Sequence, residues 1–218
     1  MLMKRVVLPF RGVVDWKAAA AGAAGHLRSG GLLAHPTETV YGIGCALRLD
    51  ALARLARIKD RAGRPFIVLA GGPEPLDGLD WPADAARLAD AFWPGPLTLI
   101  VRAEPAAFPD ALLGPGGTVA VRATSHPGLR IVIREFGEPM TSTSANPPGL
   151  SPATGFREAV SALERLDPGG SVWLLDGGDL EPSLPSTVVD CTTRPPRIVR
   201  AGATAERIRE VIRGIEPA

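Results

Sequence analysis

Short apolar runs and longer amphipathic segments alternate along the 218-residue chain. The short runs are four to six residues long and are bounded by Gly, Pro or polar residues, which is typical of β-strands. They predict ten strands, at 5–8, 32–35, 41–46, 66–69, 97–102, 118–122, 140–144, 172–176, 187–191 and 197–200. The longer segments carry apolar residues every three to four positions and predict six helices, at 16–28, 51–59, 83–92, 127–136, 156–166 and 205–213.

The order of these elements indicates the fold class. Some predicted strands follow one another directly and others are separated by a helix. We therefore expect an α/β (α+β) fold with a twisted mixed sheet rather than a purely parallel one. Asp50 is expected to cap the second helix, Pro127 to open the fourth and Gly137 to follow its end. No repeat or linker divides the chain, so a single domain over 1–218 is expected.

Composition and charge narrow the class of protein further. The net charge of +1 argues against a general affinity for nucleic acid. Cys45 and Cys191 are the only cysteines and stand far apart, so neither a disulfide framework nor a zinc cluster is predicted. The N-terminus lacks a signal-peptide core and no apolar run reaches membrane-spanning length. These features favour a cytoplasmic protein without a membrane partner.

Segment 35–44, His-Pro-Thr-Glu-Thr-Val-Tyr-Gly-Ile-Gly, is the most informative stretch of the chain. Pro36 ends the preceding strand because it has no N–H to donate. Thr37, Glu38 and Thr39 then supply two hydroxyls and a carboxylate where the chain leaves the sheet, and two glycines allow close approach of backbone. The pattern favours a loop that binds a small polar molecule. An ordinary strand connection is the alternative.

Three cations, Lys59, Arg61 and Arg64, stand at the end of the second predicted helix and in the turn that leads to the strand at 66–69. A turn at this point could direct them towards one polyphosphate group. The chain contains no P-loop sequence, so any such site would be of another kind. The alternative is that these cations only complement the dipole at the helix end.

Hydroxyl residues dominate segment 141–147, Thr-Ser-Thr-Ser-Ala-Asn-Pro. Ser142, Ser144 and Asn146 share one face of an extended chain. Such a row could bind phosphate oxygens or a carboxylate, because buried hydroxyls need partners. An edge strand with a solvated face is the alternative. Comparable polar residues stand on three other predicted strands or at their ends: Thr118, Arg122, Ser186 and Arg200.

Seven short motifs together resemble those of YrdC-type threonylcarbamoyl-AMP synthases, along nearly the whole chain. They are Pro-Thr-Glu-Thr-Val-Tyr-Gly at 36–42, Lys-x-Arg at 59–61, Trp-Pro-Gly-Pro-Leu-Thr at 93–98, Val-Ala-Val-Arg at 119–122, Ser-x-Asn at 144–146, Pro-Ser-Thr-Val-Val-Asp at 185–190 and Arg-x-Gly at 200–202. Each motif is weak alone, but seven in the family's order argue strongly against chance. Because the chain ends soon after the last motif, the extra C-terminal domain of longer relatives is expected to be absent.

The resemblance implies a three-layer YrdC-like fold around a large, mostly cationic cavity. It implies a nucleotidyltransferase that binds ATP with Mg²⁺, L-threonine and bicarbonate or CO₂. Threonine's amino nitrogen would join CO₂, and the resulting carbamate would attack the α-phosphorus of ATP, giving threonylcarbamoyl-AMP and pyrophosphate. A tRNA-threonylcarbamoyl transferase complex would then modify the adenosine next to the anticodon of tRNA. A weak contact of the chain with tRNA itself stays open.

Carried over position by position, the resemblance also assigns roles to residues. It implies catalytic roles for Lys59 and Arg61. It implies an ATP site formed by Lys59, Arg61, Arg64, Thr118, Ser144, Asn146 and Arg200. It implies a threonine site formed by Thr37, Arg122, Ser142 and Ser186, in which Arg122 pairs with the carboxylate. No protein side chain is assigned as a metal ligand.

Departures from the family pattern concern the threonine side of the site. Arg64 stands where many relatives have Asn or Lys, and Leu69 stands where some have His. These departures leave the ATP assignment standing but weaken the threonine contact expected from the strand at 66–69. Other function classes stay open: an RNA-binding or ribosome-maturation protein, a carbamoyl-transfer relative acting on another acceptor, and a diverged relative without synthase activity.

Overall fold

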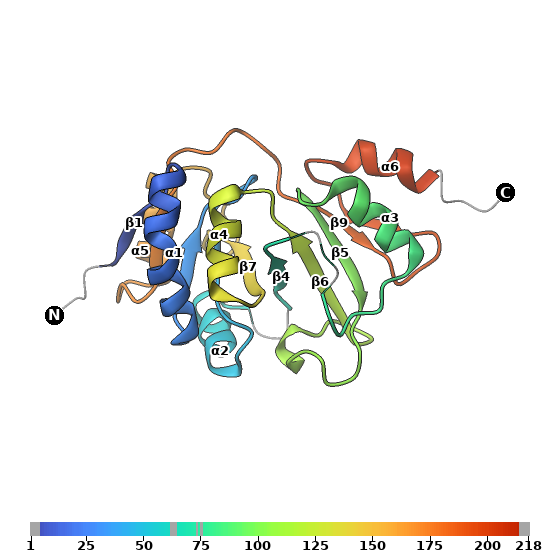
Figure 1. Ribbon diagram of the computed structural model, residues 1–218, viewed down its shortest axis with the longest axis horizontal. Coiled ribbons are helices and arrows are strands. Elements are labelled where there is room, and N and C mark those ends of the chain that lie inside the picture. The colour runs from blue at the N-terminus through green and yellow to red at the C-terminus, as the bar shows by residue number, and fades with distance from the viewer. Residues whose placement is uncertain (1–4, 62–64, 73, 75, 214–218) are drawn as a thin grey trace.

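The computed structural model describes residues 5–61, 65–72, 74 and 76–213 and contains all the predicted helices and strands (Figure 1). The strands are β1 (Val7–Pro9), β2 (Leu33–His35), β3 (Gly42–Gly44), β4 (Ile67–Ala70), β5 (Leu97–Arg102), β6 (Thr118–Ala123), β7 (Met140–Ser144), β8 (Trp173–Asp176), β9 (Thr187–Asp190) and β10 (Arg197–Arg200). The helices are α1 (Val13–Arg28), α2 (Leu49–Ile58), α3 (Ala83–Phe92), α4 (Pro127–Phe136), α5 (Phe156–Leu166) and α6 (Ala205–Arg213). A short 3₁₀ turn, η1 (Asp110–Leu112), is an addition to the prediction.

All ten strands join one sheet, in the order β1-β8-β2-β3-β7-β4-β6-β5-β9-β10. The pairs β1–β8, β2–β8, β4–β6 and β5–β9 are parallel, and the remaining neighbours are antiparallel. The mixed sheet predicted from the alternation of elements is therefore confirmed.

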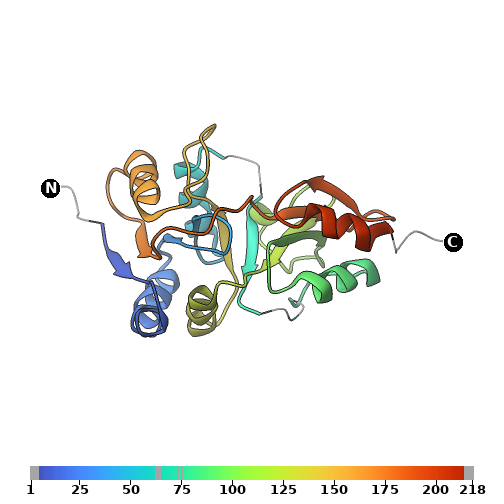
Figure 2. The same cartoon turned by 90° about the horizontal axis from the view of Figure 1, so that it is seen from above.

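Helices cover both faces of this sheet. In Figure 2, α1 and α4 lie side by side on one face, and α2 and α5 lie on the opposite face. The helices α3 and α6 lie near β5 and β9, towards the end of the sheet that β10 forms (Figure 1). Leu27 of α1 and Leu129 of α4 belong to one apolar cluster, and Leu52 of α2 and Leu163 of α5 belong to the other. Burial of these apolar stripes is what holds the helices to the sheet.

The helix ends follow the sequence signals in part. Pro127 lies in the first turn of α4, and Gly137 ends that helix with a φ of +87°, which glycine adopts without strain. The prediction for Asp50 is wrong, because the residue at the cap of α2 is Arg48 and Asp50 lies in the first turn. There its carboxylate accepts hydrogen bonds from the Arg48 guanidinium. None of the helices described is long and apolar enough to cross a membrane.

The middle of the sheet brings three of the sequence motifs together. Strand β7 lies between β3 and β4. On β7, Ser144 pairs with Gly42 of β3, and Ser142 pairs with Ile67 of β4. Strand β6, which carries Arg122, lies next to β4. The fold thus gathers motifs that are up to about 100 residues apart in sequence.

Candidate active site

A polar cavity of about 160 Å³ lies at this central part of the sheet. Its walls come from several strands and from the loops that follow β2 and precede β9. They consist of Thr37, Thr39, Val40, Gly42, Arg61, Ile67, Arg122, Ser142, Thr143, Ser144, Pro152, Pro185, Ser186 and Arg200. Small-molecule pockets usually measure roughly 300–1,000 Å³. Three arginines do line the cavity, but the large size predicted for it is not confirmed.

The structure brings most of the predicted site residues to this cavity: Thr37, Arg61, Arg122, Ser142, Ser144, Ser186 and Arg200. Lys59 and Asn146 are not among the lining residues but contact Ser144 directly. Thr118 is also not a lining residue, and its hydroxyl donates to the Pro115 carbonyl at the start of β6. Arg64 lies outside the described residues. The role of each residue stays a prediction, to which the contacts below add geometry.

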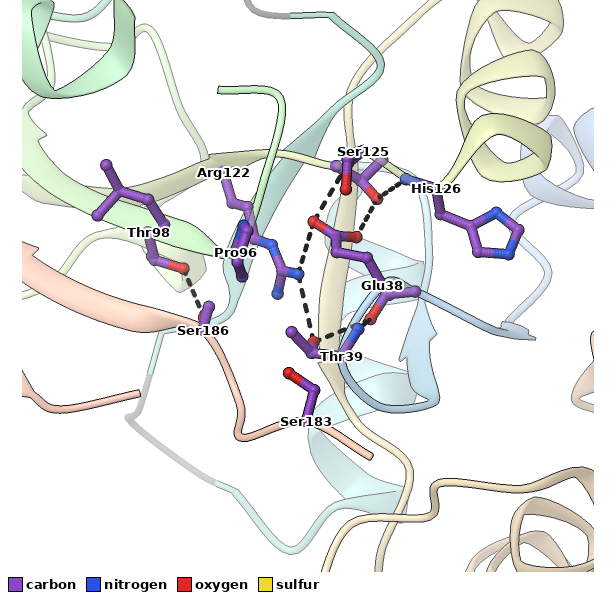
Figure 3. Close-up of polar contacts among 12 residues, drawn as sticks. Glu38, Thr39, Pro96, Thr98, Arg122, Ser125, His126, Ser183 and Ser186 are labelled. Carbon is purple, nitrogen blue, oxygen red and sulfur yellow. Dashed lines mark hydrogen bonds and ion pairs between the residues drawn. The ribbon is translucent and has the colours of Figure 1, made fainter. Parts of the chain in front are cut away.

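Arg122 is anchored on one side of its guanidinium group. Its Nη2 lies 2.9 Å from Oε1 of Glu38 and donates to Oγ1 of Thr39 at 3.3 Å (Figure 3). The Arg122 side chain is only 8% exposed, and its buried Nε has no hydrogen-bond partner among the described residues. Buried N–H groups are nearly always bonded. We therefore expect a ligand atom that accepts a hydrogen bond, such as a carboxylate oxygen, to complete this site.

Glu38 is itself held from several directions. It accepts hydrogen bonds from the Thr124 hydroxyl at 2.7 Å and from the Ser125 backbone N–H at 3.2 Å, in addition to its ion pair with Arg122 (Figure 3). Burial alone would raise the pKa of Glu38, but the charge of Arg122 and the hydrogen bonds from Arg122 and Thr124 outweigh it. The net pKa is lowered. Glu38 is therefore a carboxylate that orients Arg122 from outside the cavity lining.

The hydroxyl of Thr37 is committed to its own loop. It accepts hydrogen bonds from the backbone N–H groups of Thr39 and Val40, at 3.1 and 3.2 Å, and donates to the Val40 carbonyl at 2.7 Å. A hydroxyl has one donor and two acceptor positions, so these three bonds use its full capacity. Thr37 thus shapes the loop, and direct binding of a ligand by its hydroxyl would require a change of partner.

Ser186 and Arg200, predicted for different substrates, are bonded to each other. Nη2 of Arg200 donates to the carbonyl oxygen and the Oγ of Ser186, at 2.8 and 3.0 Å. The Ser186 hydroxyl also lies 2.9 Å from the buried hydroxyl of Thr98 (Figure 3). Burial lowers the pKa of Arg200, and the charges of Arg122 and Arg61 lower it further. The three arginines therefore repel one another, as expected for a site that binds anions.

Lys59 holds the turn that follows β7. Its Nζ donates to the Ser144 carbonyl at 2.8 Å, to the Asn146 carbonyl, and to Oδ1 of Asn146 at 3.4 Å. The Ser144 hydroxyl donates to the same Oδ1 at 2.5 Å. Burial, followed by the charge of Arg61, lowers the pKa of Lys59 to about 8. The Lys-x-Arg and Ser-x-Asn motifs are thus one structural unit, in which Lys59 positions Ser144 at the cavity wall.

Arg61 is held between the turn and the sheet. It donates from Nη1 to the Thr143 hydroxyl at 3.1 Å and from Nη2 to the Pro65 carbonyl at 3.2 Å. Its guanidinium carbon lies 5.4 Å from the centre of the Phe66 ring, a cation–π distance. These contacts fix a cation at the cavity wall. No group of three or more His, Cys, Asp or Glu residues suited to a metal ion occurs within the described part of the chain.

A family model described as "Telomere recombination" and named for Sua5, YciO and YrdC matches residues 25–202. This match covers well over half of the chain. The chain belongs to the Sua5/YciO/YrdC family. The family resemblance seen in the seven motifs is thereby confirmed. Six of the motifs supply residues to the cavity lining, and Thr98 of the remaining motif contacts Ser186.

Relatives in this family are named threonylcarbamoyl-AMP synthases. The protein of that name from Pyrococcus abyssi is 36% identical over 206 residues, which cover 92% of this chain and 58% of the relative. The one from Thiobacillus denitrificans is 37% identical over 190 residues, which cover 85% of this chain and 96% of the relative. The chain therefore spans little more than half of one relative and nearly all of the other.

A solved structure of P. abyssi Sua5 complexed with L-threonine has the same fold. It aligns with a TM-score of 0.87 and 34% identity, over 97% of this chain and 62% of that one. The YrdC-like fold expected from the sequence is therefore confirmed.

Family motifs marked several residues whose roles only the structure reveals. Glu38 stands in the first motif and Thr98 in the third, but neither was assigned a function from sequence. A carboxylate between two threonines at a strand end was the available signal for Glu38. Leu69 does not line the cavity, so no ligand contact is expected from it. It is buried in the cluster with α1 and α4, and Ile67 is the β4 residue that lines the cavity.

Two motif glycines are explained by close packing at the cavity. A Cβ on Gly42 would lie 2.6 Å from Oγ of Ser142 and 2.8 Å from the ring of His35. A Cβ on Gly202 would lie 2.2 Å from the Pro185 carbonyl oxygen. Real Cβ atoms essentially never come this close to other atoms. Both glycines therefore permit contacts that hold the cavity walls in place.

Proposed function

We propose that the chain is an L-threonylcarbamoyladenylate (threonylcarbamoyl-AMP) synthase. It would convert ATP, L-threonine and bicarbonate or CO₂ into threonylcarbamoyl-AMP and pyrophosphate. The observation that carries this proposal is the convergence of three arginines on one cavity, with Nε of Arg122 left without a partner among the described residues. A carboxylate at Arg122 and phosphates at Arg61 and Arg200 would complement these charges.

The reaction can be written from the substrates' own groups. The amino nitrogen of threonine bonds to the carbon of CO₂ and loses a proton, which gives a carbamate. A carbamate oxygen then bonds to the α-phosphorus of ATP, and pyrophosphate leaves with the electron pair of the broken P–O bond. Such steps depend on positioning and on neutralising charge, and they need no protein nucleophile. Arg61 and Arg200 would neutralise the phosphates while Arg122 holds threonine.

Mg²⁺ is proposed to enter with ATP. The family's reaction implies this ion, and the described residues offer no acidic cluster to hold it separately. The phosphates would therefore be its main ligands, and it would supply further positive charge there. The cationic side chains at the cavity fit this arrangement, in which the protein would bind the phosphate oxygens and the phosphates would bind Mg²⁺.

A tRNA-threonylcarbamoyl transferase is the proposed consumer of the product, in the cytoplasm, where tRNA is modified. A mixed anhydride of this kind reacts with water, so it must be passed on promptly. The names of the relatives support the synthase and lend no support to RNA binding or to carbamoyl transfer to another acceptor.

Pyrophosphate release tests this proposal. The protein is incubated with ATP, Mg²⁺ and bicarbonate, with and without L-threonine. Release that requires both threonine and bicarbonate is expected. Release independent of threonine, or none in protein that binds ATP, would overturn the proposal.

A further inference from the structure

His35 is a buried titratable residue directly behind the cavity wall. It is the last residue of β2, its side chain is fully buried, and it pairs across the sheet with Gly42 of β3. Its Nε2 lies 3.5 Å from Oγ of Ser142, a lining residue on β7. The absence of a side chain at Gly42 is what allows this contact, as shown by the 2.6 Å and 2.8 Å separations above. The contact with Ser142 therefore links the His35 ring to a polar group at the cavity.

The surroundings of His35 determine which of its ring nitrogens carries the proton. Nδ1 lies 3.4 Å from the Pro36 carbonyl oxygen, which can only accept a hydrogen bond. This contact favours the tautomer with the proton on Nδ1, in which Nε2 is an acceptor in a neutral ring. Burial lowers the pKa of His35 to about 4, with Pro36 and Glu38 opposing and His126 and Arg122 adding to the effect. The ring is neutral at pH 7.

The direction of the Ser142 hydroxyl follows from this tautomer. An acceptor at Nε2 requires Ser142 to donate its only O–H to His35. The lone pairs of Ser142 Oγ then face the cavity. The hydroxyl can accept a hydrogen bond there, but it has no second proton to donate. Ionised carboxylate and phosphate oxygens are themselves acceptors, so they cannot form a hydrogen bond with Ser142 Oγ in this orientation. An amino group has N–H donors and can form one.

We propose that His35 is a positioning residue that fixes Ser142 as a hydrogen-bond acceptor for the amino group of the substrate. The inference rests on the proposed function and assigns the amino end of threonine to Ser142 and its carboxylate end to Arg122. Accepting one N–H of the amine leaves its lone pair free to point towards CO₂. A merely structural His35 would not discriminate between ligands with and without an amino group.

Two ligands that differ only in that group test the proposal by calorimetry: L-threonine and (R)-3-hydroxybutanoate, which lacks the amino group. In His35→Phe, which keeps a ring of similar size, the affinity for L-threonine is expected to fall about tenfold, which corresponds to the loss of one hydrogen bond. The affinity for (R)-3-hydroxybutanoate should change less than twofold. His26→Phe is the matched control, because His26 stacks on Trp173 and binds the Leu32 carbonyl.

A double substitution separates positioning from packing. If His35 acts through Ser142, adding His35→Phe to Ser142→Ala should change threonine affinity less than twofold. Equal losses for both ligands, or additive losses in the double variant, would overturn the inference. Wild-type protein that binds neither ATP nor threonine would instead overturn the proposed function, and this inference with it.

Nitrogen-15 NMR of the wild-type protein supplies a test that does not depend on a variant folding. The chain has three histidines, and the His26→Phe spectrum removes one from the assignment. The Nδ1–H tautomer is expected for His35. A proton on Nε2 would reverse the direction of the Ser142 hydroxyl and contradict the proposal.

Discussion

Replacing Gly42 with alanine is a sharp test of how the cavity is built. The added methyl group would lie 2.6 Å from Oγ of Ser142, whereas ordinary van der Waals contact begins near 3.4 Å, so one of them must move by about 0.8 Å. The His35 ring, 2.8 Å from the same methyl group, is fully buried. Ser142 can rotate, and its rotation would relieve the contact by moving its hydroxyl from its place at the cavity wall.

Two consequences follow for Gly42→Ala. Overpacking of this kind costs about 1–3 kcal/mol of unfolding free energy, which a denaturant titration would measure. Calorimetry should show threonine affinity falling at least tenfold and ATP affinity changing little. Gly25→Ala is the control, because a Cβ there meets nothing within 4 Å and α1 should gain about 0.5–1 kcal/mol. Wild-type threonine affinity in folded Gly42→Ala would refute the account of Gly42, His35 and Ser142.

Three further predictions concern the charged residues. Glu38→Gln should cost about 1–2 kcal/mol of stability and lower threonine affinity more than ATP affinity, because Arg122 loses a charged partner. Glu135→Gln, at an exposed position, is the control. Equal losses of affinity for both ligands would contradict the role of Glu38 in orienting Arg122. Arg61→Ala should lower kcat/KM for ATP roughly 10- to 100-fold with the fold intact. Arg57→Ala, at an exposed position, is the control and should leave kcat/KM unchanged. A wild-type kcat/KM in Arg61→Ala would show that Arg61 does not belong to the phosphate site. The pKa of Lys59, lowered to about 8, means that its ammonium loses its proton as the pH rises from 7 to 9. Calorimetric ATP affinity without threonine should then fall about tenfold over this range, and a constant affinity would show that the charge of Lys59 is not needed.

Local patterns in the sequence predicted every helix and strand, but not all of their bounds: α1 begins at Val13 rather than at residue 16, and β3 spans Gly42–Gly44 rather than 41–46. The apolar run at Leu97–Arg102 and the amphipathic segment at Phe156–Leu166 were bounded correctly, because turn residues flank both. The cap at Asp50 was predicted wrongly because a capping preference does not show which neighbouring guanidinium will take the carboxylate. The strand order follows from long-range packing, which no local pattern contains.

The candidate site was predictable as a set of residues but not as a set of contacts. The motifs nominated Arg122 and Ser142, yet the partners that orient them, Glu38 and His35, lie outside the cavity lining. The phosphate role of Lys59 stays a prediction, and the structure adds that its three hydrogen bonds hold the turn with Ser144. Which side of a polar group faces the ligand depends on its other partners, and those are set by the folded chain.

The central claim is that the carbon of bicarbonate or CO₂ becomes part of an adenylate of threonine. Incubating the protein with ATP, Mg²⁺, L-threonine and ¹³C-labelled bicarbonate, followed by mass spectrometry of the nucleotide products, tests it directly. A threonylcarbamoyl-AMP product that carries one ¹³C atom is the expected result. An unlabelled adenylate of threonine, formed with release of pyrophosphate, would contradict the claim and indicate attack by the threonine carboxylate instead.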